Sequence, residues 1–391
     1  MHVALFVKDF AVGEKFSKNG LPTKSGAEFH AENHALQLIK RGHRVSIFAK
    51  KRHFFTKARE TLNGIDLVRL HAPIRWLEII FRLFSTHRNV NAFYIIGTPK
   101  FAVWAILYAR IFHVPVTLAL TGKAEIFDKN KNWRNKILST CTNYIATTHE
   151  IQNGLIRYGG VEPGRVTVLA HGVDMSKYPP VTDAQKQALR KAHNIPFDAH
   201  VLLFCARIVL NKGIDVVMRI WPQLHAQDPK AVLLVVGGGR HELMHELQNM
   251  AAHVDGTAVI VGEVDNPREY YQMADVYIFP SHHEGLPTSL IEAMSSGLPA
   301  VTSDIGGCDD LIFNDVTGYR VTVDEDGVFL EKVRYLFQHR EQRLRMGKHA
   351  TGIVRKYCDY TQIIDKLADI LACEQPCGRD YLQVSDEIKL L

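Results

Sequence analysis

The sequence lacks the features of membrane-spanning and disulfide-rich proteins. It contains no run of about 18 apolar residues, and the nearest stretch, 101–120, is interrupted by Arg110, His113 and Pro115. The six cysteines are scattered without a CxxC pair, which favours reduced thiols and no cysteine-bound metal. The N-terminus has neither a basic region nor a small-residue cleavage site, so we expect a first strand there rather than a signal peptide. These absences favour a cytoplasmic globular protein.

Charge is distributed unevenly along the chain. Residues 1–180 contain 26 Lys and Arg against 12 Asp and Glu, a net +14, whereas 181–391 contain 21 against 29, a net −8. Such a difference indicates that the first half meets a polyanionic surface, either an anionic membrane or nucleic acid. No recognisable nucleic-acid-binding motif accompanies the charge. A domain that is simply basic is the alternative.

Short β-rich runs alternate with helical patterns along the whole chain. The runs are nearly continuous in apolar residues, as is typical of strands buried on both faces of a parallel sheet. They lie at 3–7, 44–49, 66–70, 92–96, 114–120, 143–147 and 165–169 in the first half, and at 200–206, 231–237, 257–262, 275–280 and 298–303 in the second. This alternation predicts an α/β fold with two Rossmann-like, doubly wound parallel sheets.

The length of the chain favours two domains. Pro179–Pro180, within the stretch 174–185, prevents a helix and marks the join. We expect residues 1–178 to form the first domain, 179–358 to form the second, and a C-terminal helix within 359–391 to pack back on the first. Ligands of doubly wound sheets bind outside the carboxyl ends of the strands, so the chemistry is expected there, in a cleft between the domains.

Two glutamates, Glu284 and Glu292, lie eight positions apart in the stretch PSHHEGLPTSLIEAM, residues 280–294. The pattern predicts a strand, a turn, and then a helix that Thr288 or Ser289 caps, with Glu284 before the helix and Glu292 one turn inside it. The helix N-terminus favours an anion such as a diphosphate. Carboxylates are strong acceptors for sugar hydroxyls, so the segment fits a nucleotide-sugar. A surface loop with a first-turn acid is the alternative.

Positive charge and glycine follow other strands of the second half. Arg207 and Lys212 come just after the strand 200–206, where cations are placed to neutralise phosphate oxygens. Two solvated loop charges are the alternative. Glycines end two further strands, at 237–239 and 306–307, and they are expected to let a ligand approach the backbone closely.

Several segments of the second half resemble retaining glycosyltransferases of family 4, which have the GT-B fold. EGLPTSLIEA resembles their E-x7-E motif, and CARIVLNKG resembles their phosphate clamp, with Ala206 where glycine is usual. SDIGGCDDLI, NDVTGYRV and LAHGVDMSKY are similar to further blocks of the family. The resemblance covers residues 145–325 well and the first 140 residues loosely.

The resemblance implies roles for individual residues. Arg207 and Lys212 would hold the diphosphate and act with Glu284 in catalysis, Glu284 would contact the donor sugar, and Glu292 would contact the ribose. Gly26 would approach the donor phosphate from the first domain, although Ser25 replaces the usual first glycine. The implied donor-binding set is Gly26, Arg207, Lys212, Gly238, Glu263, Val264, Glu284, Gly285, Leu286, Thr288 and Glu292, with Glu263 and Val264 bordering the base.

The sequence departs from the family after the strand that ends near residue 120. The family often has a histidine there, whereas this chain has Thr121 and Gly122, so Thr121 or Lys123 is expected to line the site. No DxD-type metal motif occurs in the cleft segments, and we expect no metal and no cofactor. His171, His282 and His283 are expected to be structural or rim residues.

The first half is expected to bind the acceptor. Residues 50–59 are basic with two Phe, and they include Lys51 and Arg52 on the acceptor side. Residues 75–84 are apolar except for Arg75, Glu78 and Arg82, which share one helical face, as in helices that lie in a membrane interface. A helix buried against the sheet is the alternative.

These patterns predict a metal-independent, retaining hexosyltransferase. It would move a sugar from a nucleotide donor, most simply a UDP-sugar, to a glycolipid or polysaccharide such as lipopolysaccharide, capsule or a lipid-linked oligosaccharide. We expect it at the inner face of the cytoplasmic membrane, in peripheral contact with anionic lipid. The alternatives are a nucleotide-sugar epimerase of the same fold and a sugar-binding protein without catalysis.

Overall fold

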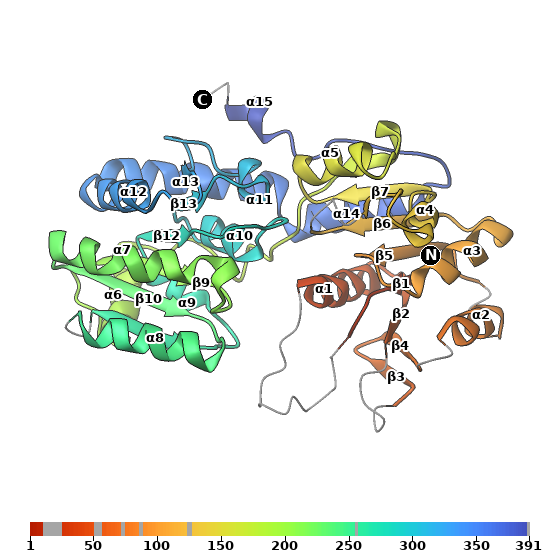
Figure 1. Ribbon diagram of the computed structural model, residues 1–391, viewed down its shortest axis with the longest axis horizontal. Helices are drawn as coiled ribbons and strands as arrows, with labels where there is room; N and C mark the ends of the chain where they lie inside the picture. The colour runs from red at the N-terminus through yellow and green to blue at the C-terminus, as the bar shows by residue number, and fades with distance from the viewer. Residues whose placement is uncertain are drawn as a thin grey trace. The chain divides into compact units, whose positions relative to one another are not determined.

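The computed structural model describes residues 1–10, 26–50, 57–71, 75–85, 89–122, 127–254 and 257–388 (Figure 1). The chain divides into two compact units. The first consists of Met1–His171 and Thr361–Leu382, and the second consists of Gly172–Tyr360 and Gln383–Leu391. The C-terminal segment is thus shared, since residues up to 382 belong to the first unit and the last ones to the second.

The first unit contains an eight-stranded sheet of order β3-β4-β2-β1-β5-β6-β7-β8. Its strands are β1 (His2–Phe6), β2 (Arg44–Lys50), β3 (Arg59–Leu62), β4 (Ile65–Leu70), β5 (Ala92–Ile96), β6 (Val116–Leu120), β7 (Asn143–Ala146) and β8 (Val166–Val168). All pairs are parallel except β3 with β4, which form a hairpin that the sequence analysis missed. Its turn, Asn63–Gly64, has positive φ at both residues, as a tight hairpin turn requires.

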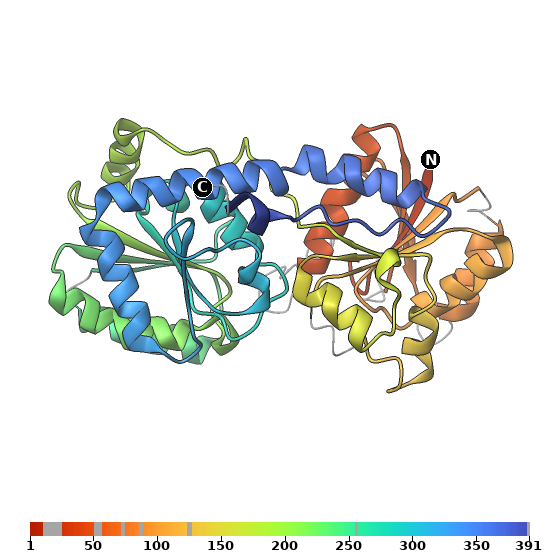
Figure 2. The same cartoon turned by 90° about the horizontal axis from the view of Figure 1, so that it is seen from above.

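Helices of the first unit cover its sheet (Figure 2). They are α1 (Gly26–Lys40), α2 (Arg75–Ser85), α3 (Ala102–Phe112), α4 (Trp133–Leu138), α5 (His149–Arg157) and, from residue 361 on, α14 (Tyr360–Ala372). The central strands β1 and β5 are buried along their full length, which explains why their sequences are continuous apolar runs. Across the parts of the chain that the structure describes, no helix has the length and apolar character needed to cross a bilayer.

The second unit contains a six-stranded, wholly parallel sheet of order β11-β10-β9-β12-β13-β14. The strands are β9 (His200–Cys205), β10 (Ala231–Val236), β11 (Ala258–Gly262), β12 (Val276–Phe279), β13 (Ala300–Ser303) and β14 (Gly318–Val321). The strand order reverses between β9 and β12, which is the point where doubly wound sheets bind ligands. The predicted α/β fold with two Rossmann-like parallel sheets is therefore confirmed, while β14 was not predicted as a strand.

Helices cover both faces of the second sheet (Figure 2). One layer holds α7 (Ile214–Gln227), α8 (His241–Ala252) and α12 (Asp326–Gln338), and the other holds α6 (Asp183–Ala192), α9 (Arg268–Met273), α10 (Thr288–Ser295) and α13 (Arg340–Tyr357). Short helices α11 (Gly306–Asp309) and α15 (Val384–Ile388) complete the unit. Trp221 of α7 and Phe204 of β9 are fully buried in the core between the first layer and the sheet.

Candidate active site

Most of the predicted donor-binding residues follow the carboxyl ends of strands in the second sheet. Arg207 comes two residues after β9, Gly238 two residues after β10, Glu263 directly after β11, and Glu284 in the loop after β12. Because these strands are parallel, their carboxyl ends meet at one edge of the sheet, on both sides of the β9/β12 switch point. The fold therefore brings Arg207 and Glu284, which are 77 positions apart in sequence, to the same edge of the sheet.

Lys212 and Glu284 form an ion pair at this edge. Lys212 ends a 3-10 turn, Leu210–Lys212, and the hydroxyl of Ser281 donates to both the Asn211 carbonyl (2.8 Å) and Glu284 Oε1 (3.1 Å). The Lys212 side chain is 16% exposed and that of Glu284 is 13% exposed. Lys212 is therefore not a solvated loop charge, because Glu284 pairs with it from the loop after β12.

Gly213, which follows Lys212, explains how the two loops approach so closely. Its φ is +74°, and a Cβ at this position would lie 1.9 Å from the carbonyl oxygen of Pro280. A side chain there would push the Lys212 turn away from the end of β12. Glycine at this position therefore supports the ion pair rather than a ligand.

Arg207, two residues after β9, is exposed. The backbone on either side of it bonds to the segment after β10, since the N–H of Ala206 donates to the Val236 carbonyl (3.0 Å) and the N–H of Ile208 to the Gly238 carbonyl (2.8 Å). These bonds fix the backbone while the guanidinium faces solvent. An exposed guanidinium on a fixed backbone is suited to an anionic ligand.

The glycines after the strands serve mainly to pack backbone on backbone. A Cβ on Gly237 would lie 1.9 Å from the Ala206 carbonyl oxygen, and one on Gly307 would lie 2.0 Å from that of Gly285. We had expected these glycines to leave room for a ligand, but their missing side chains make room for the loops of the site itself. Gly238 differs, because a Cβ there would meet the Glu263 carboxyl at 2.9 Å, so these two predicted donor-binding residues are neighbours.

Helix α10 begins at Thr288 without a side-chain cap, and Pro287 stands at its N-cap position. The prediction that Thr288 or Ser289 caps the helix was wrong, because the Ser289 hydroxyl instead accepts a hydrogen bond from the Tyr277 hydroxyl (2.9 Å). Gly285 and Leu286, in the loop before the helix, are buried. The N-cap residue Pro287 therefore supplies no side-chain cap, and the dipole of α10 favours a negatively charged ligand at this end.

Glu292 lies in the second turn of α10 and is largely enclosed. Its Oε2 accepts a hydrogen bond from the Tyr271 hydroxyl at 2.9 Å. Burial raises the pKa of Glu292 to about 7, although hydrogen bonds from Tyr271 and Tyr178 act in the opposite direction. The two tyrosine rings meet edge to face with centroids 5.8 Å apart. The sequence analysis missed both tyrosines, because no motif links them to the glutamate.

The remaining predicted residues are less enclosed or lie elsewhere in the chain. Val264 is half-buried and Glu263 is exposed. In the first unit, Gly26 is exposed at the start of α1, with nothing within 4 Å of a Cβ built on it. Thr121, directly after β6, is half-buried. Lys51, Arg52 and Lys123 lie outside the described residues.

Thr121 borders a small cavity of the first unit that is lined by histidines. His171, predicted to be structural or at a rim, is buried and stacks on His30 with ring centroids 3.6 Å apart. Burial lowers the pKa of His171 to about 3 and that of His34 to about 4, so these rings are neutral near pH 7. In the second unit, His282 and His283 are half-buried in the loop after β12.

The helix expected to lie in a membrane interface, α2, buries one face and exposes an apolar one. Ile79 and Leu83 are fully buried, which agrees with the alternative of a helix packed on the sheet. The polar residues Glu78 and Arg82, expected on one helical face, pair with each other at 3.4 Å and are largely covered. Exposed apolar side chains of α2 and the adjacent α3 are Leu77, Phe81, Phe84, Ile111 and Phe112.

No group of three or more His, Cys, Asp or Glu side chains suited to a metal ion occurs within the described ranges. Arg207 and Lys212 are cationic donors that follow the carboxyl end of β9.

Two family models of glycosyltransferases match the two halves of the chain. Residues 24–177 match the model of Glycosyltransferase Family 4, and residues 185–353 match that of Glycosyl transferases group 1. A D-inositol 3-phosphate glycosyltransferase of Catenulispora acidiphila is 31% identical over 228 residues, which cover 55% of this chain and 52% of that protein. The gpi3 subunit of the phosphatidylinositol N-acetylglucosaminyltransferase of Schizosaccharomyces pombe is 22% identical over 388 residues, 94% of this chain and 82% of its own. Against the first of these relatives, the matched region spans about half of the relative's length.

Solved structures, one of them named as a glycosyltransferase, share the fold. Anabaena HepE in complex with UDP has a TM-score of 0.79 at 17% identity, and the match covers 95% of this chain and 100% of that one. WaaG, a glycosyltransferase involved in lipopolysaccharide biosynthesis, has a TM-score of 0.69 at 16% identity and covers 94% and 99%. The chain therefore has the GT-B fold, and its two segments 24–177 and 185–353 match the glycosyltransferase models Glycosyltransferase Family 4 and Glycosyl transferases group 1.

Proposed function

We propose that the chain is a retaining glycosyltransferase that takes its sugar from a nucleotide-sugar. The observation that carries this proposal is the Lys212–Glu284 ion pair, beside the uncapped N-terminus of α10 at the switch point of the second sheet. A cation and a helix N-terminus suit a diphosphate, and a carboxylate suits sugar hydroxyls. The groups suited to the two parts of a nucleotide-sugar thus come from the turn after β9, the loop after β12 and the start of α10.

The proposed roles follow from these positions. Arg207 and Lys212 neutralise the diphosphate, Glu284 accepts hydrogen bonds from the donor sugar, and Glu292 accepts them from the ribose. In the first unit, Gly26 is proposed to contact the donor phosphate and Thr121 to contact the transferred sugar. Glu263 and Val264 border the base.

The proposed chemistry is a substitution at the anomeric carbon on the face that the diphosphate leaves. The bond from that carbon to the phosphate oxygen breaks, and a bond to the acceptor oxygen forms with the same configuration. The acceptor hydroxyl gives its proton to the leaving diphosphate, so no side-chain base is required. Arg207, Lys212 and the N–H groups at the start of α10 stabilise the charge that grows on the diphosphate, which is the electrostatic contribution to the rate. Because these charges belong to the chain, we propose that turnover needs no metal.

The donor is proposed to be a UDP-sugar. HepE, which shares the fold, has been solved in complexes with UDP, with UDP and glucose, and with UDP-glucose. The acceptor is proposed to be a glycolipid or polysaccharide. The relatives are named for inositol phosphate, for phosphatidylinositol and, in Staphylococcus aureus CapM at 24% identity, for capsular polysaccharide biosynthesis.

We also propose that the first unit contacts anionic lipid at the inner face of the cytoplasmic membrane. The net charge of residues 1–180 is +14, from 26 − 12, and basic residues are attracted to anionic lipid by about 1 kcal/mol each near the surface. The exposed apolar side chains of α2 and α3 supply a face that enters the lipid headgroup region. A lipid-linked acceptor would be reached from that surface.

Incubation with a panel of UDP- and GDP-sugars, with and without a lipid extract as acceptor, tests the proposed function. The expected result is acceptor-dependent release of UDP and a product whose anomeric configuration, measured by NMR coupling constants, equals that of the donor. A new nucleotide-sugar formed without an acceptor would identify an epimerase instead. Saturable donor binding without any turnover would identify a sugar-binding protein.

A further inference from the structure

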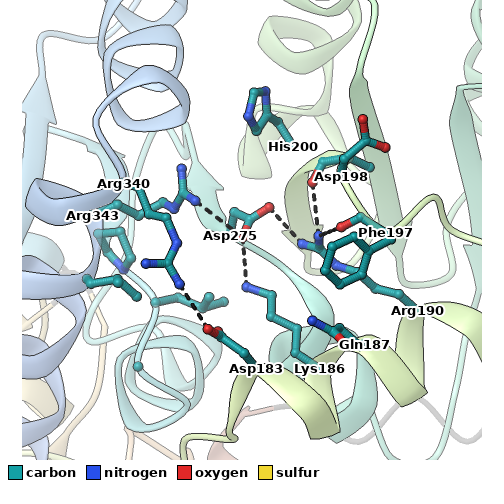
Figure 3. A pocket seen from close by; sticks show the side chains of 15 residues that line it. Asp183, Lys186, Gln187, Arg190, Phe197, Asp198, His200, Asp275, Arg340 and Arg343 are labelled. Atoms are coloured by element: carbon teal, nitrogen blue, oxygen red, sulfur yellow. Dashed lines mark hydrogen bonds and ion pairs between the residues drawn. The ribbon is translucent and has the colours of Figure 1, made fainter.

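A second charged cavity lies in the second unit, away from the candidate donor site. Its volume is about 270 Å³, and Figure 3 shows the side chains that line it. His200 opens β9, Asp275 directly precedes β12, and Pro299 directly precedes β13, so the cavity lies at the amino edge of the sheet. Arg207 and Glu284 follow the carboxyl ends of the same strands. The cavity therefore belongs to the opposite edge of the sheet from the donor site.

A single buried carboxylate at the cavity faces three cations. Asp275 lies 2.7 Å from Lys186 Nζ, 2.7 Å from Arg190 Nη2 and 3.9 Å from Arg343 Nη2. Burial opposes ionisation of Asp275, but the three positive charges outweigh it and lower its pKa to about 2. Three positive charges and one negative charge leave a net +2 in this cluster.

Two of the other charged residues that line the cavity, Arg340 and Asp198, are each paired with an opposite charge. Arg340 Nη2 lies 2.9 Å from Asp183 at the rim, and Asp198 lies 2.7 Å from Lys230. His200 Nδ1 lies 2.6 Å from Asp228. Among the described residues that line the cavity, the acids are Asp183, Asp198 and Asp275, so none of them balances the remaining +2.

The three inner cations differ in how their N–H groups are used. The Arg190 guanidinium donates to the carbonyls of Met273, Phe197 and Ala199 as well as to Asp275, so it anchors α6 to the sheet. Lys186 has three N–H donors, of which Asp275 accepts one at 2.7 Å. Burial lowers the pKa of Lys186 against the attraction of Asp275, which means that enclosing this cation is unfavourable without a further anion.

Arg343 reaches the cavity from α13. Its Nη1 donates to the carbonyls of Leu336 and Phe337 at the end of α12, while its Nη2 faces Asp275 at a distance too long for a hydrogen bond. Burial also lowers the pKa of Arg343. Lys186 and Arg343 thus approach the cavity from two helices, and both can direct an N–H group to a ligand between α6 and α13 (Figure 3).

We propose that this cavity binds a small phosphate dianion, either inorganic phosphate or a phosphomonoester, between Lys186 and Arg343. Phosphate carries a charge of about −2 at pH 7 and offers several acceptor oxygens, which matches the excess charge of the cluster. The Phe197 side chain, 64% exposed, lines the same cavity and offers an apolar surface to the organic part of a phosphomonoester. A cavity of about 270 Å³ admits a sugar phosphate but is small for a complete nucleotide-sugar.

Isothermal titration calorimetry with inorganic phosphate tests this, in the presence of saturating UDP so that the candidate donor site is filled. Wild-type protein is expected to bind phosphate saturably with a Kd below about 10 mM. Gln187→Glu adds a negative charge at an exposed lining residue of α6, where it leaves the fold intact, and is expected to raise the Kd at least about tenfold. Gln248→Glu, the matched control on exposed α8, is expected to leave the Kd unchanged.

A parallel titration with glucose 1-phosphate separates the two sources of the ligand. Tighter binding than inorganic phosphate, lost in Phe197→Ala, assigns the cavity to a phosphomonoester, and equal binding assigns it to free phosphate. Lys186→Gln is expected to weaken both ligands, whereas Lys212→Ala in the donor site is expected to weaken neither. Absence of saturable phosphate binding below about 10 mM, or a Kd that Gln187→Glu leaves unchanged, would overturn the proposal and leave the cations as partners of Asp275 alone.

Discussion

Lys212 and Glu284 are 72 positions apart in sequence, yet they form an ion pair between the turn after β9 and the loop after β12. Both side chains are largely covered, and the Ser281 hydroxyl bonds to Asn211 in the first loop and to Glu284 in the second. A donor diphosphate would therefore meet a lysine that already has a carboxylate partner. The pair is expected to hold the two loops in position before the donor binds. The Glu284 carboxylate also neutralises part of the positive charge that Lys212 would offer to the phosphate.

The first prediction concerns this ion pair. Lys212→Ala is expected to lower kcat/KM by about tenfold to a thousandfold, because one charge partner of the leaving diphosphate is removed. It is also expected to lower the free energy of unfolding by about 1–3 kcal/mol, because the enclosed Glu284 carboxylate loses its cation. Steady-state kinetics and urea denaturation measure the two effects separately.

The double variant Lys212→Ala/Glu284→Gln serves as the control. Removing the negative charge as well is expected to recover most of the stability but none of the activity. Near-normal kcat/KM in Lys212→Ala would remove the pair from the proposed mechanism. A double variant as unstable as the single one would show that Glu284 does not depend on the lysine.

The second prediction concerns the pH dependence of nucleotide binding. With a pKa of about 7, Glu292 is ionised only above neutral pH, and the ionised carboxylate is the stronger acceptor for ribose hydroxyls. The affinity for UDP, measured by calorimetry, is expected to rise from about pH 6 to about pH 8. Glu292→Gln is expected to bind UDP more weakly and to remove this part of the pH dependence. Glu284→Gln is expected to affect donor selectivity and turnover more than UDP affinity. An equal loss of UDP affinity in both variants would contradict the assignment of Glu284 to the sugar and Glu292 to the ribose.

The third prediction concerns stability and the same glutamate. The folded-state pKa of Glu292 is raised from 4.5 to about 7, so the folded chain binds this proton more tightly than the unfolded chain. Its contribution to stability is full below about pH 4.5 and is lost as the pH rises through 7. Tyr271→Phe removes a hydrogen bond that favours the carboxylate, so it is expected to shift the midpoint of this loss to higher pH. Thermal denaturation between about pH 5 and pH 9 compares wild type, Tyr271→Phe and Glu292→Gln. An unshifted midpoint in Tyr271→Phe would contradict the proposal that the Tyr271 hydroxyl stabilises the Glu292 carboxylate.

The sequence predicted the sheets well because buried parallel strands require continuous apolar runs, and 200–206 and 231–237 needed no tertiary information. It also placed Glu284 before α10 and Glu292 within it, since strand, turn and helix signals follow one another there. It did not predict the partners of these glutamates. Tyr271 meets Glu292 only because α9 and α10 pack on the same side of the sheet, and no local pattern records that contact.

The glycines and the cavity around Asp275 also depend on tertiary contacts that the sequence does not reveal. A glycine after a strand can make room either for a ligand or for neighbouring backbone, and the sequence does not distinguish the two. At Gly237 the structure shows neighbouring backbone, because the Ala206 carbonyl occupies the space of a Cβ. The cavity is built from α6, α13 and the amino ends of three strands, so its charge depends on which cations the fold brings to Asp275. The hairpin of β3 and β4 was, by contrast, recognisable from Asn63–Gly64.

The fourth prediction concerns metal ions. Because the proposed charge stabilisation comes from Arg207, Lys212 and the start of α10, activity is expected to survive excess EDTA. Turnover is measured by UDP release before and after chelation, and again after adding magnesium or manganese. Loss of activity that either metal restores would show that carboxylates of the chain hold a catalytic cation.

The last prediction concerns the apolar surface on α2 and α3. Phe81 is 69% exposed and Ile111 is 70% exposed, so replacing them with serine removes little buried area and is expected to leave the fold intact. If this surface enters the headgroup region, Phe81→Ser/Ile111→Ser should reduce co-sedimentation with anionic vesicles, mainly in the part of the binding that resists salt. The electrostatic part should weaken for all variants as salt rises from about 0.05 to about 0.5 M, because the Debye length falls below 10 Å.

Leu210→Ser, an equally apolar change at an exposed position of the second unit, should bind vesicles as wild type does. Wild-type protein that stays in the supernatant at low salt, or a double variant that sediments as wild type does, would leave α2 and α3 without a lipid partner and favour a soluble acceptor.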